Sequence, residues 1–178
     1  MSYDLLVYTS SIPDGLRDQW PAAIARSGLI AEVSPEFDPA KPDGYVAWKV
    51  SVADPEAFRF ASNYGTKPVE AGFELLTRDS EFEPDDWKTA APDVVERVEE
   101  ASQTWVFSNP HGGKPADLRL QWFAAATLAQ LADGVLLDPQ EDQSFLGEAA
   151  LAEAAFQADK FEEEQRDDWT ESTAFEGW

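Results

Sequence analysis

The sequence of 178 residues predicts an α+β fold, in which a ferredoxin-like β-α-β-β half is followed by a second α/β half around a central buried helix. Three patterns support this prediction. Residues 45–52 alternate apolar and polar side chains, which is typical of a half-buried strand. Residues 69–77 repeat the alternation and predict a partner strand. Residues 115–133 follow a helical period and are apolar around most of the helix.

The predicted N-terminal α+β half covers residues 1–78. Pro21 lies inside its predicted helix and indicates that this helix is kinked or begins late. The β-α-β-β order is the basis for the ferredoxin-like prediction. The predicted elements are, in order, a strand at 3–8, a helix from Leu16 to about Ser27, and strands at 29–33, 45–52 and 69–77.

Residues 79–91 are acidic and contain Pro84, which predicts a linker between the two halves. The C-terminal half, 92–165, is expected to pack its helices and strands on the same core. It begins with a short helix at 92–101 and a strand at 104–107. Residues 166–178 form an acidic tail with interspersed aromatic side chains.

The central helix begins at Pro115, whose missing N–H is not needed in the first helical turn. Gly134 stands where a left-handed C-cap is expected. Residues 135–137 then predict a short buried strand that ends before Pro139. Ser144 is expected to cap a last helix over residues 145–165. The inward positions predicted for that helix are Leu151, Ala154, Ala155, Ala158 and Phe161.

Charge is the strongest compositional signal, because 35 Asp and Glu residues face 13 Lys and Arg residues, for a net charge of −22. Such a chain repels nucleic acid and anionic lipid, so we expect no nucleic-acid and no membrane partner. A basic protein partner is favoured instead. Two alternatives explain the acidity equally well: solubility alone, or a cytoplasm of high salt concentration. The absence of cysteine, of a signal-like N-terminus and of a long apolar run predicts a cytoplasmic protein.

Reactive motifs are sparse. His111 is the only histidine and lies in a predicted loop, where exposure to solvent is the simplest expectation. The glycines before Lys114 resemble a phosphate loop, but the upstream glycine and the following Ser or Thr are missing. The sequence therefore predicts no cofactor and no catalytic residue. A carboxylate-based, metal-dependent hydrolase is the alternative, since acidic residues cluster after the strand at 135–137 without the spacing of a calcium loop.

The tail combines acidic residues with aromatic residues such as Trp169 and Phe175. One interpretation is that the aromatic side chains dock onto the protein's own core. A second is that they form a partner-binding surface, because aromatic anchors within a charged rim are typical of interface hot spots. A third is self-association through the tail. We also expect the tail to lie beside the acidic turn at 138–142.

Residues 128–140, with the sequence LAQLADGVLLDPQ, resemble a segment of small uncharacterised bacterial α+β proteins. Some of those proteins resemble immunity proteins that neutralise secreted toxins. The resemblance implies a bacterial cytoplasmic protein that antagonises a toxin. It covers a small part of the chain and transfers no functional residue.

These observations predict a non-enzymatic acidic binding protein that blocks or caps a basic protein partner. Occlusion of the partner and complementary charge would supply the mechanism, with tryptophan side chains as anchors. The predicted partner-binding residues are Asp138, Glu141, Asp142, Asp167, Asp168 and Trp169.

Overall fold

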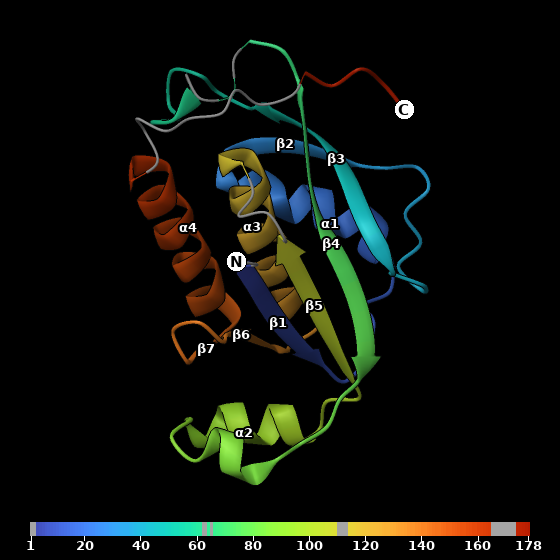
Figure 1. Cartoon of the computed structure of the whole chain (residues 1–178), viewed down its shortest axis with the longest axis vertical. Helices are drawn as coiled ribbons and strands as arrows, with labels where there is room; N and C mark the ends of the chain where they lie inside the picture. The colour runs from blue at the N-terminus through green and yellow to red at the C-terminus, as the bar shows by residue number, and fades with distance from the viewer. Residues whose placement is uncertain (1–2, 62–63, 65, 110–113, 165–173) are drawn as a thin grey trace.

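A computed structural model describes residues 3–61, 64, 66–109, 114–164 and 174–178. Its strands are β1 (Tyr3–Thr9), β2 (Leu29–Val33), β3 (Gly44–Val52), β4 (Val69–Asp79), β5 (Gln103–Asn109), β6 (Val135–Asp138) and β7 (Gln143–Leu146). Its helices are α1 (Leu16–Ile24), α2 (Pro92–Glu99), α3 (Pro115–Leu131) and α4 (Gly147–Glu164), with the short 3-10 helices η1 (Ala25–Ser27) and η3 (Pro84–Trp87). The predicted α+β class is confirmed (Figure 1).

All seven strands belong to one sheet, in the order β2-β3-β4-β5-β1-β6-β7, and every neighbouring pair is antiparallel. Strand β1 does not pair with the other strands of the predicted N-terminal half. It lies between β5 and β6, which belong to the predicted C-terminal half. The two halves are therefore joined through the hydrogen bonds of a single sheet.

The main hydrophobic core lies on one face of this sheet, under α1, α3 and α4. Helix α3 occupies its centre, and Figure 1 shows α4 beside it. Every residue of α3 from Pro115 to Ala129 is buried except Asp117, which is partly exposed. The central buried helix predicted from the sequence is thus confirmed.

Aromatic side chains connect α1 to the middle of the sheet. The Trp20 ring meets the rings of Trp48 and Phe107 edge to face, at centroid distances of 5.5 and 6.0 Å. Its indole N–H donates to the carbonyl oxygen of Ala124 on α3, at 2.8 Å. The indole N–H therefore keeps a hydrogen-bond partner although the ring is buried. Helix α1 begins at Leu16 even though Pro21 lies within it, so it does not begin late.

Helix α3 ends differently from the sequence prediction. Asp133, and not Gly134, adopts the left-handed conformation, with φ of 48°. The N–H of Gly134 donates to the carbonyl oxygen of Ala129 at 2.7 Å, which is the long bond of a Schellman motif. Gly134 is required for a different reason: a Cβ atom there would lie 2.3 Å from the carbonyl oxygen of Tyr8. A side chain at this position would push α3 away from β1.

The start of the last helix was also predicted incorrectly. Ser144 and Phe145 belong to β7, which pairs with β6, and α4 begins at Gly147. The reason is the turn between these strands, where Asp142 takes a φ of 53° and lets the chain reverse at once. The buried stripe of α4 is consequently Ala150, Ala154, Ala158 and Glu162, while the predicted Leu151, Ala155 and Phe161 are partly exposed.

A buried ion-pair network fastens α4 to α3. The Arg119 side chain of α3 is 2% exposed and pairs with Asp159 and with Glu162, whose side chain is fully buried. Tyr64 donates its hydroxyl proton to Glu162 at 2.7 Å, and burial raises the pKa of Tyr64 well above its usual value, so it remains a donor. The guanidinium also stacks over the ring of Phe58, at 4.8 Å from its centroid.

We expect Gly134→Ala to lower the free energy of unfolding by about 1–3 kcal/mol, because the added methyl group overlaps the Tyr8 carbonyl. Asp133→Gly is the matched control. It removes the cost of a positive φ and loses only the surface pair with Arg97, so a change below about 1 kcal/mol is expected. Urea unfolding of both variants checks this, and equal stabilities would contradict it.

Glu162→Gln is expected to destabilise the protein by about 3 kcal/mol, because it leaves the buried Arg119 without one of its counter-charges. The neighbouring Glu163 provides the control. Its ion pair with Arg59 is exposed on both sides, at 58% and 63%, so Glu163→Gln should cost less than about 1 kcal/mol. Thermal and urea unfolding of the two variants would refute the prediction if their losses were similar.

Candidate functional site: the open face of the sheet

The face of the sheet opposite α3 is only partly covered. Register places Ile30 of β2, Tyr45 of β3 and Leu76 of β4 on this open face, where they are 50%, 59% and 45% exposed. They are three of the five large hydrophobic side chains that are exposed among the described residues. Tyr45 and Leu76 lie on the adjacent strands β3 and β4, whereas Ile30 lies farther along the sheet, and neighbouring exposed apolar groups are typical of an interaction surface.

Tyr45 is held in place by an unusually close approach to β4. Its ring lies over Gly72, where a Cβ atom would come within 2.5 Å of the Tyr45 ring and hydroxyl. Burial of one side of the phenol, together with the charges of Asp117 and Glu70, raises the pKa of Tyr45 to about 12. The hydroxyl therefore stays protonated and is available as a hydrogen-bond donor.

An apolar row crosses four adjacent strands on the same face. Leu76 of β4 faces Val106 of β5, Val106 faces Leu6 of β1, and Leu6 faces Leu137 of β6. Val106, Leu6 and Leu137 are each partly exposed. We call these four residues the apolar row.

One end of the open face is covered by the segment that joins β4 to β5. This segment contains η3 and α2, and it forms a small second core with β1 and β6. Figure 1 shows α2 at one end of the sheet, away from α3 and α4. The buried members of this second core are Tyr8, Trp87, Val94, Val98 and Val135.

A groove of about 470 Å³ lies between this covering segment and strands β1, β6 and β7. Leu6 and Leu137 line it, so the groove is continuous with the apolar row. Exposed carboxylates of Glu81, Asp86 and Asp142 surround this apolar floor. We call this space the acidic groove; its other lining residues are Tyr8, Arg78, Trp87, Thr89, Ala90, Pro139 and Ser144.

Two aromatic side chains of the second core also line the acidic groove. The rings of Tyr8 and Trp87 stand perpendicular, at 86°, with their centroids 5.3 Å apart. Burial raises the pKa of the Tyr8 hydroxyl, while Arg78 lowers it and Asp86 raises it. Charges of both signs therefore act on one buried phenol at this end of the sheet.

The residues predicted to bind a partner fall into three groups. Glu141 and Asp142 are exposed on the turn between β6 and β7, and Asp142 lines the acidic groove. Asp138 is only 1% exposed. Asp167, Asp168 and Trp169 lie outside the described residues, as does His111.

Asp138 organises the acidic turn from inside. It accepts hydrogen bonds from the Tyr3 hydroxyl and the Gln140 backbone N–H, both at 3.0 Å. Burial, and next the charge of Asp138, raise the pKa of Tyr3, which keeps the phenol a donor. When the Gln140 amide is oriented so that both its nitrogen and its oxygen have partners, its side chain hydrogen-bonds the N–H and carbonyl groups of Asp4. These bonds extend the β1–β6 pairing past Pro139, which has no N–H to donate. Asp138 therefore acts on the turn from a position that a partner would not touch.

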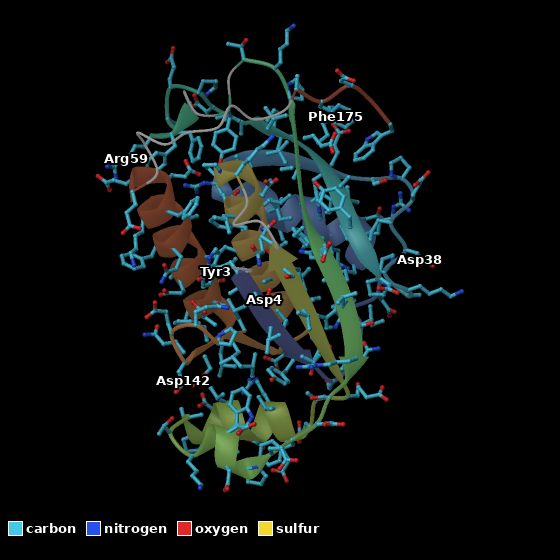
Figure 2. All side chains as sticks on the ribbon, viewed as in Figure 1. Tyr3, Asp4, Asp38, Arg59, Asp142 and Phe175 are labelled. Atoms are coloured by element: carbon cyan, nitrogen blue, oxygen red, sulfur yellow. The ribbon has the colours of Figure 1, made fainter. Side chains whose placement is uncertain are left out.

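The described end of the tail lies away from this turn, contrary to the sequence expectation. Ala174 forms a bridge with Val69 of β4, and the N–H of Phe175 donates to the carbonyl oxygen of Pro68 at 3.0 Å. The Phe175 ring lies 5.8 Å from Nζ of Lys49 on β3. Figure 2 shows Phe175 and Asp142 at opposite ends of the sheet.

The sequence reasoning missed the apolar row and most of the groove. The acidic stretch at 79–91 was noted, but only as a linker. The signal that could have identified the row lies in β1, β5 and β6, where neighbouring residues such as Leu5 and Leu6 are both apolar. Strands that are apolar on both faces need a cover on each side, or present one face to a partner.

Within the described part of the chain, no group of three or more His, Cys, Asp or Glu side chains is placed to hold a metal ion. Among the same residues, no helix is long and apolar enough to cross a membrane. Comparisons with protein-family models, with curated proteins and with solved structures found no match to this chain.

Asp138→Ala is expected to lower the free energy of unfolding by about 1–3 kcal/mol, because the Tyr3 hydroxyl and the Gln140 N–H lose their acceptor. Glu141→Ala removes an exposed carboxylate from the same turn and should change stability by less than about 0.5 kcal/mol. Chemical denaturation of both variants tests this difference. A larger loss of stability in the Glu141 variant would show that Asp138 is not the residue that supports the turn.

Proposed function

We propose that this chain is a non-enzymatic binding protein that blocks or caps a basic protein partner with the open face of its sheet. The observation that carries the proposal is the acidic groove, whose apolar floor continues into the apolar row. Apolar contact area and an excess of exposed carboxylates meet at a single place. Such a combination supports both affinity and selectivity for a basic partner.

Long-range electrostatics supports the same assignment. The net charge of −22 attracts a cationic protein from a distance and repels anionic competitors. At the groove, the carboxylates of Glu81, Asp86 and Asp142 outnumber the guanidinium of Arg78. A basic partner would therefore be guided toward this end of the open face before any apolar contact forms.

Short-range contacts would come from the apolar groups of the open face. Leu76 and Tyr45 are exposed by about half their surface, and the Tyr45 ring packs closely over the backbone of Gly72. Side chains already ordered in the free protein lose little entropy on binding, which favours tight association. Glu141, Asp167, Asp168 and Trp169 remain predicted contacts of the partner, whereas Asp138 would act through the turn it supports.

The local resemblance to immunity proteins suggests the biological setting of such a complex. In that setting the partner is a secreted toxin with a basic surface, and this chain acts in the bacterial cytoplasm. Coverage of the toxin's functional surface would neutralise it without any chemical step.

We expect affinity capture from the native host to retain a basic protein at low salt and to release it at high salt. With the purified partner, the association rate should fall at least about tenfold as salt rises, because screening removes the long-range attraction. Identification of the eluted protein and stopped-flow association kinetics provide the measurement. Association that ignores salt would contradict the proposal.

A matched pair of variants locates the surface. Asp86→Asn with Asp142→Asn removes two charges from the acidic groove. Glu36→Gln with Glu56→Gln removes two exposed charges from the loops that follow β2 and β3, so the net charge of both double variants is equal. The groove variant should associate about tenfold more slowly than the control variant. Equal slowing would indicate that only net charge matters.

A further inference from the structure

We propose that the acidic groove accepts an arginine side chain of the basic partner, and that Arg78 of this chain competes with it for the groove carboxylates. The inference rests on the proposed function and specifies the residue type that enters. It follows from the chemistry of the groove walls, which combine aromatic rings, an apolar floor and separated carboxylates.

The aromatic residues and the leucine floor of the groove are already packed in the free protein. Tyr8 and Trp87 are 9% and 8% exposed, so packing in the second core holds both rings. Leu6 and Leu137 are paired within the sheet. A volume of about 470 Å³ lies within the range of sites that hold small ligands, and it is ample for one long side chain.

Arginine fits these walls better than lysine does. Its planar guanidinium stacks on aromatic rings and is weakly hydrated, whereas the lysine ammonium is a strongly hydrated point charge. Asp86 of η3 and Asp142 of the β6–β7 turn approach the groove from different elements. A guanidinium carries several N–H groups in a fixed plane, so it can donate to more than one carboxylate, whereas an ammonium offers a single point of charge. The aliphatic stem would rest on the leucines of the floor.

Arg78 is the internal counterpart of such a guest. It is exposed, and it is the one Lys or Arg among the described residues that line the groove. Its charge acts on Tyr8 together with that of Asp86, so it lies within electrostatic reach of the groove carboxylates. In the free protein it offsets part of their mutual repulsion. An entering arginine must compete with Arg78 for the groove carboxylates, so weakly basic partners are expected to bind less well.

The test is calorimetric titration of the full chain with two short peptides that differ only at their centre, where arginine or lysine stands between leucines. We expect the arginine peptide to bind about five- to tenfold more tightly. Nuclear magnetic resonance shifts on binding should centre on the amides of Leu6 and Leu137. Arg78→Gln should tighten both peptides several-fold, and the Asp86→Asn, Asp142→Asn variant should weaken both. The Glu36→Gln, Glu56→Gln variant should bind like the wild type.

The outcomes separate this inference from the function on which it rests. Equal affinity for the two peptides would overturn the preference for arginine, even where capture of a basic partner remains dependent on salt. Resonance shifts confined to other surfaces would overturn the groove as the site. Unchanged binding by Arg78→Gln would overturn its role as competitor. Failure of the proposed function would show in a different measurement, the association rate of the natural partner, which would then not depend on salt concentration.

Discussion

The structure depends on the need to cover α3 on every side. A helix without a solvent-facing side is stable only when other layers enclose it. The sheet covers one side, α1 packs on another, and α4 lies along it. Its buried polar groups then need partners inside the protein, and Gln121 finds several: it bonds the backbone of Tyr3 and Phe107 and the side chain of Asn109. These bonds tie the chain start and β5 to the same helix.

Enclosure of α3 uses one face of the sheet and leaves the other face available. Some apolar residues on that second face are buried under the β4–β5 segment, and others, such as Tyr45 and the apolar row, are exposed or partly exposed. The protein therefore separates its two tasks physically. Stability resides in the core around α3, and the charged and apolar groups suited to recognition lie on the opposite side. The buried Arg119 network belongs to the first task, because Arg119 and Glu162 are both enclosed in the core that joins α3 to α4.

Local patterns in the sequence predicted most helices and strands, because alternation and helical spacing are short-range properties. They predicted the burial of α3 from Ala124, Leu128 and their neighbours for the same reason. The position of β1 between β5 and β6 could not be predicted, since it depends on pairs such as Leu5 with Phe107, far apart in the chain. The acidic groove combines Leu6, Asp86 and Asp142 from three distant segments. The sequence shows each residue, but it could not predict that the fold brings them together.

Strands β4 and β5 are neighbours in the sheet, and the ends of the segment between them are joined by a bond from the Ser80 N–H to the Ser102 carbonyl oxygen at 3.1 Å. A tight turn could connect two such strands. Residues 80–102 instead make a long excursion that carries Trp87 and the carboxylates of one groove wall. The excursion is thus an insertion into a hairpin, outside the core that α3 organises. A different segment at this place can change the groove wall without touching the core around α3, provided that it still covers Tyr8 and Val135.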